Sequence, residues 1–310
     1  MQQWKWMRAK RAQLMKPSLT SINTGLSLLL GCLAIAPPAN AAASLPEWPL
    51  APAASAAAVA TCDATDEKIW VWLPQHGDAP AQAMLQRWQQ HPLAALSGCL
   101  QYRTYSDAEQ LQCTVNGERQ HQRCNLPLLP RELLQRHIVF TDAEIGSASA
   151  QQIVLPLNAN LTVFAHEIAH WLGFADEYQM SPSLAKNYCQ GRYEHPSLNV
   201  VLTRSKQLSA QELEQLWQRL PWREAIADWR LLGQQQADGK WLLGSASSTE
   251  VGLFTSQTCA GVAGVYSWKP VAKLTAMEYH DVNVWPTVYL ETARALQRGS
   301  RLRNHDDGAE

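Results

Sequence analysis

The sequence predicts an α+β fold with an N-terminal mixed sheet and a loop-rich C-terminal part. Short runs of β-branched and aromatic residues alternate with helical patterns as far as Gly173. After that glycine, turn-forming residues become frequent and helical patterns occur only in stretches. With 310 residues, 46% of them hydrophobic and 17% charged, the chain can bury a sizeable core. We expect one main domain at 62–300, with an upper half at 62–173 and a lower half at 174–300.

Residues 1–41 have the pattern of a secretory signal peptide. Basic residues come first, an apolar run follows at 26–36, and small residues at 39–41 offer a cleavage site. The apolar run is too short for a stable membrane span, so we expect a secreted or periplasmic protein without such a span after cleavage. The alternative is a lipoprotein anchored through Cys32, because LLGC resembles a lipoprotein box. The Ala- and Pro-rich residues 42–61 predict a linker or a short pro-segment.

Six of the seven cysteines follow the signal peptide, and an even number in an exported protein predicts up to three disulfides. Cys113 and Cys124 flank an Asn-Gly dipeptide, a turn signal that would bring them together in a hairpin. Six cysteines allow 15 connectivities in principle, and with this first pair we expect the other two to be Cys62–Cys99 and Cys189–Cys259. The cysteine spacings match no zinc-binding pattern.

In the upper half, apolar and aromatic residues predict short strands and an amphipathic helix at 79–91. The strands expected in chain order are 69–74, 100–106, 111–116, 137–143 and 151–158. The next helix begins at Asn160, a natural N-cap. It carries apolar residues at helical spacing up to Gly173, which can terminate it.

In the lower half, residues 209–233 predict a helical stretch that Pro221 interrupts. A last helix is expected around 288–299, followed by a frayed polar tail at 301–310. Short apolar runs and glycine-containing segments lie between these helices and predict short strands and loops.

The segment HEIAH at 166–170 carries the chemistry of the chain. Residues four apart on a helix project from the same face, so His166 and His170 can bind one metal ion. Glu167 lies beside them, where it can act as general base and acid for a water molecule. Zinc lowers the pKa of such a water towards about 7. The motif therefore predicts zinc-dependent hydrolysis.

The third zinc ligand has three candidates on the grounds of chemistry. Asp176 completes the spacing HExxHxxGxxD, in which Gly173 allows the chain to turn back towards the metal. Glu177 could serve instead if the turn is one residue looser, or it could orient a histidine. Glu224 is a remote candidate on the stretch REAIADW. We favour Asp176.

The spacing HExxHxxGxxD resembles that of the metzincin zinc peptidases. Members of that group carry a methionine turn beneath the metal, and the segment AMEYH makes Met277 the matching residue. In astacin- and serralysin-like members a tyrosine two residues further on can bind the metal or the oxyanion. That position is Tyr279 in this chain. The resemblance implies a metzincin-like zincin fold.

Three further segments resemble exported IgA-peptidase-type zincins. They are DEY at 176–178, VGLF at 251–254 and GVYSWKP at 264–270, and DEY is also similar to immune-inhibitor-A-type proteases. The resemblance covers about residues 150–285 and is specific chiefly in the zinc motif. The chain departs from those families in having Lys-Pro at 269–270 where they usually have Arg-Pro, and in the spacing of its acidic ligand.

We therefore expect an exported zinc endopeptidase with a protein or peptide substrate, which residues 151–158 would bind as an edge strand. The net charge of −1 argues against an electrostatic hold on nucleic acid. One alternative is a gluzincin-type peptidase that uses Glu224 as the third ligand. The other is a non-catalytic zinc-binding protein of the cell envelope.

Overall fold

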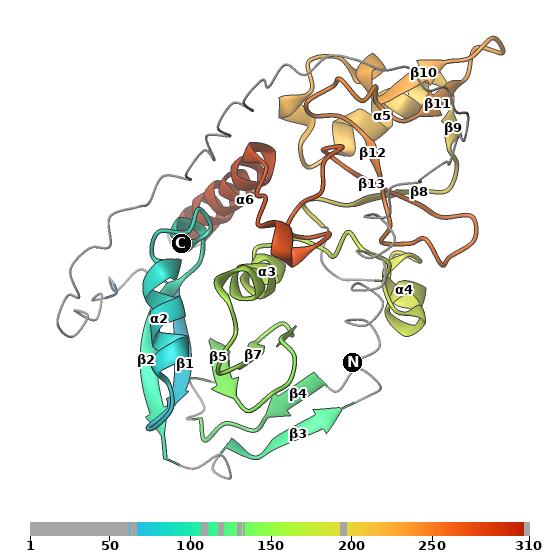
Figure 1. The fold of residues 1–310 in the computed structure, drawn as a ribbon. Coiled ribbons are helices and arrows are strands. Elements are labelled where there is room, and N and C mark those ends of the chain that lie inside the picture. The colour runs from blue at the N-terminus through green and yellow to red at the C-terminus, as the bar shows by residue number, and fades with distance from the viewer. Residues whose placement is uncertain are drawn as a thin grey trace, which may run out of the picture. The chain divides into compact units, whose positions relative to one another are not determined.

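The computed structural model describes residues 62, 67–106, 111–116, 121–128, 132, 134–192 and 197–306, of which 300–306 as backbone alone. These residues belong to one compact unit, Ala60–Glu310. The expected signal peptide at 1–41 lies outside the described residues, as does all of the linker at 42–61. Helices and several sheets are combined in this unit, so the predicted α+β class is confirmed (Figure 1).

A five-stranded mixed sheet forms the N-terminal part, with strand order β2-β1-β5-β7-β6. The four strands β1, β2, β5 and β7 run parallel to one another, and β6 is antiparallel to β7. Their bounds are Lys68–Pro74 for β1, Cys99–Tyr105 for β2, Arg136–Thr141 for β5, Ser147–Ala148 for β6 and Gln152–Pro156 for β7. The inner strands β5 and β7 are almost continuously buried, as the strands of a sheet covered on both faces must be.

The expectation that residues 151–158 form an edge strand is wrong. Strand β7 pairs with β5 on one side and with β6 on the other. The edge next to α3 is therefore β6, which is formed by residues that carried no strand prediction. A hydrophobic pattern shows that a strand is buried, but it does not say which segment pairs with it.

Successive residues of the central strands point to opposite faces of the sheet. On one face, Ile138 and Phe140 join the main core with the helices α2 (Ala79–Trp88) and α3 (Leu161–Trp171). The ring of Phe164 on α3 packs edge-on against Trp88 of α2 at 4.9 Å between ring centroids. These helices therefore cover one face of the sheet (Figure 1).

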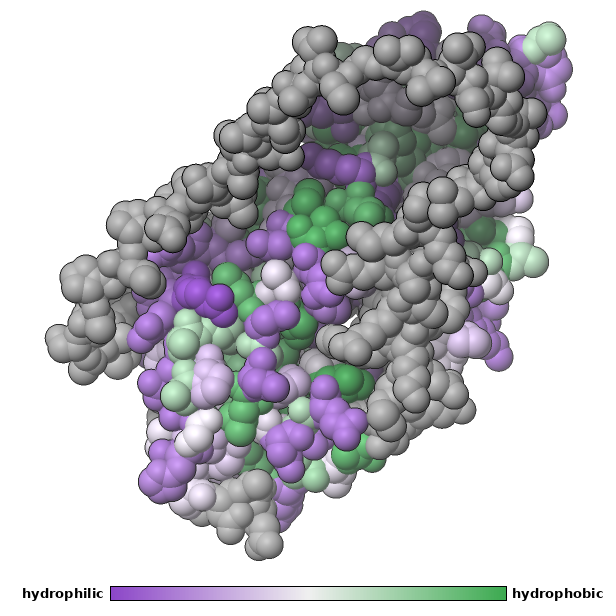
Figure 2. Space-filling view, viewed as in Figure 1, coloured by the Kyte–Doolittle hydropathy of each residue, from purple (hydrophilic) through white to green (hydrophobic). Residues whose placement is uncertain are grey.

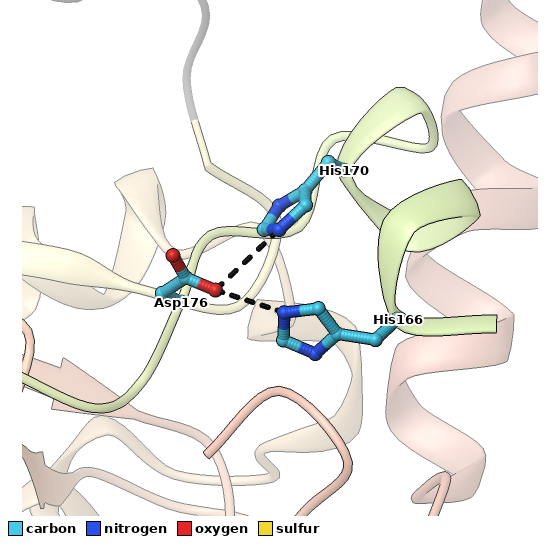
Figure 3. A group of neighbouring side chains, drawn as sticks. All are labelled: His166, His170 and Asp176. Carbon is cyan, nitrogen blue, oxygen red and sulfur yellow. Dashed lines mark ion pairs between the residues drawn. The ribbon is translucent and has the colours of Figure 1, made fainter. Parts of the chain in front are cut away.

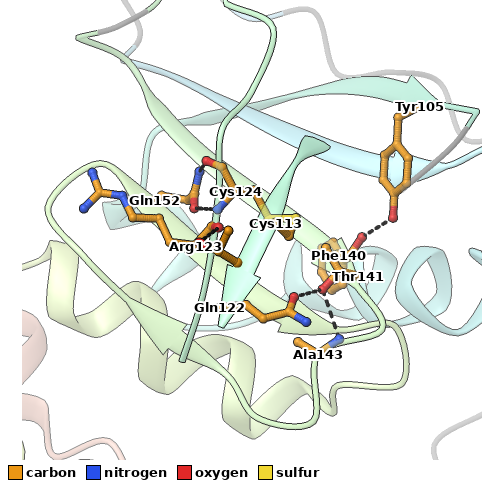
Figure 4. The surroundings of a disulfide bond; sticks show 10 residues. Tyr105, Cys113, Gln122, Arg123, Cys124, Phe140, Thr141, Ala143 and Gln152 are labelled. Atoms are coloured by element: carbon orange, nitrogen blue, oxygen red, sulfur yellow. Dashed lines mark hydrogen bonds between the residues drawn. A yellow bond between two sulfur atoms is a disulfide. The ribbon is translucent and has the colours of Figure 1, made fainter. Parts of the chain in front are cut away.

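The other face is covered by a hairpin of β3 (Cys113–Asn116) and β4 (His121–Cys124). Its inward-facing Cys124 packs with Val139 and Val154 of the sheet. The side chain of Gln152 accepts a hydrogen bond from the backbone N–H of Cys124 and donates one to its carbonyl (Figure 4). These two hydrogen bonds hold the hairpin to the sheet.

The lower half is built from short elements. One small sheet has the strand order β12-β13-β8 and the other has the order β10-β11-β9. The helices α4 and α5 also belong to this half. Their bounds are Val201–Thr203 (β8), Gln207–Leu208 (β9), Gly233–Gln235 (β10), Trp241–Leu243 (β11), Phe254–Ser256 (β12), Tyr266–Lys269 (β13), Pro182–Tyr188 (α4) and Ala210–Arg219 (α5). The face shown in Figure 2 mixes polar and apolar residues, with apolar residues gathered near its middle.

The helical prediction for residues 209–233 holds only for α5, which has a capping box at Ser209 and ends at Arg219. Two 3₁₀ turns, Arg223–Ala225 and Trp229–Leu232, follow instead of a second helix. Pro221 explains the break, because it lacks an N–H and disfavours a helical conformation in the residue before it.

The last helix is longer than the sequence pattern predicts. Helix α6 spans Thr287–Asp306, so residues 301–306 of the expected polar tail continue this helix; residues 307–310 lie outside the described part. Gly299 costs only about 1 kcal/mol in a helix and does not end it. The buried residues of α6, Val288, Tyr289 and Ala293, join the main core.

All three predicted disulfides are present: Cys62–Cys99, Cys113–Cys124 and Cys189–Cys259. The second joins directly paired residues of the β3–β4 hairpin (Figure 4). Three disulfides are typical of proteins that fold in an oxidising compartment outside the cytosol. None of the helices in the described ranges is both long and apolar enough to cross a bilayer.

Candidate metal centre

Helix α3 has the caps that its sequence predicts. The side-chain oxygen of Asn160 accepts a hydrogen bond from the N–H of Val163 at 2.8 Å. At the other end Gly173 has a positive φ of 97°, and its N–H donates to the carbonyl of His170. The next N–H, of Phe174, donates to the carbonyl of Ala169, which completes a Schellman motif. The chain thus reverses directly after the second histidine.

This reversal brings His166, His170 and Asp176 together (Figure 3). One ligand atom from each lies within 4.8 Å of the other two. Oδ1 of Asp176 is 3.1 Å from Nε2 of His166 and 3.4 Å from Nε2 of His170. The side chains of His166 and Asp176 are about nine-tenths buried, whereas that of His170 is 24% exposed.

Backbone carbonyls orient both imidazoles. Nδ1 of His166 lies 2.9 Å from the carbonyl oxygen of Ala276, and Nδ1 of His170 lies 2.9 Å from that of Phe174. A carbonyl oxygen can only accept, so each Nδ1 carries the hydrogen. In the neutral ring the lone pair is then on Nε2, the atom that faces Asp176. This is the arrangement that a histidine metal ligand requires.

The electrostatics of the cluster fit a bound cation. Burial lowers the pKa of His166, but the Asp176 carboxylate, the charge of Glu167 and the carbonyl of Ala276 together outweigh burial and raise this pKa to about 9. Burial raises the pKa of Asp176, but the charges of His170 and His166 outweigh it and lower that pKa to about 2. Oδ1 of Asp176 is buried and makes no hydrogen bond of good geometry. Two imidazole nitrogens and one such carboxylate oxygen are a donor set that suits Zn²⁺.

Glu167 lies on the same helix and is 9% exposed. Burial raises the pKa of its carboxyl, opposed by the charges of the two histidines. A carboxylate with a raised pKa is suited to accept a proton and return it near neutral pH. A Cβ at Gly146 would lie 3.2 Å from Oε1 of Glu167, so the chain just before β6 borders this carboxylate and leaves it room.

The two other acidic candidates lie elsewhere. Glu177 is fully buried, and its carboxylate accepts hydrogen bonds from Asn199, Thr275 and Tyr289 rather than joining the cluster. The side chain of Glu224 is 86% exposed and pairs with Arg223 at 2.8 Å. It stands in a 3₁₀ turn, not on the helix that the sequence suggested.

The segment AMEYH forms a turn against α3. The N–H groups of Glu278 and Tyr279 both donate to the carbonyl of Thr275. Met277 within this turn is fully buried. The ring of Tyr279 lies 5.8 Å from that of His280 between centroids, and the ring of His280 lies 6.3 Å from that of His166.

Two aromatic neighbours of the cluster were not assigned a role from the sequence. The ring of Tyr178 stacks on that of His166 at 6.3 Å between centroids, and its hydrogen bond helps to lower the pKa of Asp176. His280 is the other, and burial lowers its pKa more than the charge of Asp281 raises it. The feature of the sequence that could have pointed to Tyr178 and His280 is their position directly beside Glu177 and Tyr279.

No family model, curated protein or solved structure gives a significant match to this chain. The function of the chain therefore has to be inferred from the geometry and chemistry of the cluster itself.

Proposed function

We propose that this protein is an exported zinc-dependent endopeptidase with a metzincin-like zincin fold. The observation that carries the proposal is the convergence of His166, His170 and Asp176, with Glu167 one position along the same helix. The carbonyl-oriented rings and the chain reversal at Gly173 support it, because both direct the ligand atoms to one point. The three disulfides and the N-terminal segment support a secreted or periplasmic location.

In this proposal His166, His170 and Asp176 hold the zinc ion. Zinc, when bound, acts as a Lewis acid that polarises the scissile carbonyl and lowers the pKa of water. Glu167 takes the proton from the attacking water and gives it to the leaving amine, which its raised pKa favours. The burial of the site keeps competing solvent away from this carboxylate.

The protein or peptide substrate is proposed to add to the sheet as an extended strand beside β6. Strand β6 is the outermost strand at the α3 side of the sheet, and the residue before it, Gly146, borders Glu167. The turn around Met277 supports His166, because the carbonyl of Ala276 in this turn orients the imidazole ring. Tyr279, at the end of this turn, is the proposed oxyanion stabiliser.

Metal content and proteolysis test the proposal directly. Purified protein is expected to hold about one zinc ion per chain, measured by mass spectrometry of the metal. It should cleave an unfolded protein such as casein, lose this activity on dialysis against EDTA and regain it with added zinc. Wild-type protein that takes up no zinc would overturn the proposal. Zinc uptake without cleavage of any substrate in a peptide library would favour the non-catalytic alternative.

Two matched alanine variants identify the third ligand. Asp176→Ala is expected to weaken zinc binding by more than roughly 100-fold, because even groups that only support a ligand contribute about 10–100-fold. Glu224→Ala is expected to bind zinc like the wild type, since its carboxylate is exposed. Competition with a chromophoric chelator measures both affinities. The reverse result would support the gluzincin-type alternative.

A further inference from the structure

A buried pair of opposite charges lies next to the metal centre and has no part in the proposed chemistry. Glu177 is fully buried and Lys269 is 3% exposed, with Nζ 3.3 Å from Oε2. Nζ also pairs with the carboxylate of Glu278 and donates to the carbonyl of Lys273 at 3.1 Å. Removing two charges from water costs several kcal/mol for each ion unless the surrounding groups compensate well. Such a pair therefore calls for an explanation.

All hydrogen-bonding atoms of Glu177 are occupied. Oε1 accepts from Nδ2 of Asn199 at 2.7 Å and from the hydroxyl of Tyr289, and Oε2 accepts from Oγ1 of Thr275 at 2.7 Å. Its backbone N–H donates to the carbonyl of Met277 at 2.9 Å. Its carbonyl accepts from the backbone N–H of Gln257 at 2.9 Å and from Oγ of Ser256 at 3.1 Å. One residue thus joins the ligand loop to four other segments of the chain.

Two of these bonds flank the group that orients His166. Ala276 stands between Thr275, whose hydroxyl donates to Glu177, and Met277, whose carbonyl accepts from it. The peptide between these two anchors carries the carbonyl oxygen that lies 2.9 Å from Nδ1 of His166. Movement of Glu177 would therefore move the hydrogen-bond partner of His166.

The same residue also fixes the loop that supplies Asp176. Glu177 is its next neighbour in the chain, so the six residues that hydrogen-bond to Glu177 restrict the backbone on which Asp176 stands. Asn199 holds the preceding residue as well, because it accepts from the N–H of Ala175 and donates to its carbonyl. Oγ1 of Thr258 donates to the carbonyl of Asp176 at 2.8 Å.

We propose that Glu177, paired with Lys269, is a positioning residue of the metal centre. Its buried carboxylate holds the turn at Ala276 against His166 and the loop of Asp176 in one network, so that both ligands keep their places. The inference depends on the proposed function in that His166 and Asp176 are taken as zinc ligands. It assigns to Glu177 a task different from that of a ligand.

Glu177→Gln tests this proposal, because the amide keeps the shape of the side chain but replaces one acceptor oxygen by a donor group. Zinc affinity, measured by chelator competition, is expected to fall about 10–100-fold. The visible spectrum of the cobalt-substituted variant is expected to shift, because the orientation of His166 changes. The matched control is Glu132→Gln, which neutralises another buried carboxylate, paired with Arg103. This control should leave zinc affinity and cobalt spectrum unchanged.

Tyr289→Phe removes one donor to Glu177 and keeps the ring, which stacks on Phe174. It is also expected to lower zinc affinity, but by a smaller factor than Glu177→Gln does. It tests the proposal if Glu177→Gln fails to fold. Wild-type zinc affinity and an unchanged cobalt spectrum in the folded variants would overturn the positioning role. A wild-type protein that binds no zinc would instead overturn the proposed function.

Discussion

Glu167→Gln is expected to lower the rate of peptide hydrolysis by about 10²–10⁴-fold while zinc stays bound. The amide has nearly the same size as the carboxylate, but it cannot take a proton from water. Glu167 does not belong to the group of converging ligand atoms, so its loss leaves the donor set complete. The turnover of a quenched fluorescent peptide and the zinc content of the same sample measure the two effects.

Glu214→Gln is the matched control for this experiment, because Glu214 is an exposed residue of α5. It should keep wild-type turnover and wild-type zinc content. Full activity in Glu167→Gln would contradict the assignment of Glu167 as general base. Loss of zinc together with activity would show that this residue supports the metal site rather than the proton transfer.

Lys269→Met is expected to reduce the free energy of unfolding by about 3–5 kcal/mol, the usual cost of removing one partner of a buried ion pair. The variant leaves Glu177 fully buried without the ammonium group that lies 3.3 Å away in the wild type. The hydrogen bonds from Asn199, Thr275 and Tyr289 remain, but they carry no full positive charge. Urea denaturation under oxidising conditions measures the change.

Two further variants separate charge burial from loss of packing. Lys186→Met on the exposed side of α4 should change the free energy of unfolding by less than about 0.5 kcal/mol. The double variant Glu177→Gln, Lys269→Met should be more stable than the sum of the single effects predicts, since no uncompensated charge remains at 177. A Lys269→Met protein as stable as the Lys186→Met control would contradict the role of the ion pair.

Much of the segment that carries the candidate metal ligands could be predicted from the sequence, because its interactions are local. The N-cap at Asn160 and the chain reversal at Gly173 depend on residues within one or two turns of the helix. The spacing of His166, His170 and Asp176 then follows from helix geometry and one glycine-dependent turn. The hairpin that joins Cys113 and Cys124 was predictable for the same reason.

The sequence predictions were wrong where a regular pattern continues beyond the element that forms. They were also wrong where an element is too short to show a pattern. Residues 223–232 keep apolar residues at helical spacing, yet they form 3₁₀ turns after Pro221. The edge of the sheet was misassigned because β6 has only two residues, which is too few for a recognisable period.

The sequence alone predicted the α+β class, the HEIAH helix with its caps and the three disulfide pairs, and it favoured Asp176 over the other acidic residues as a candidate ligand. Only the tertiary structure decided how these parts support one another. His166 meets the carbonyl of Ala276 110 residues away, and Glu177 meets Tyr289 112 residues away. No local pattern encodes such contacts, because they arise when the core brings distant segments together. Glu177 is thereby separated from Asp176, its neighbour in the chain: one carboxylate faces the histidines and the other holds the framework behind them.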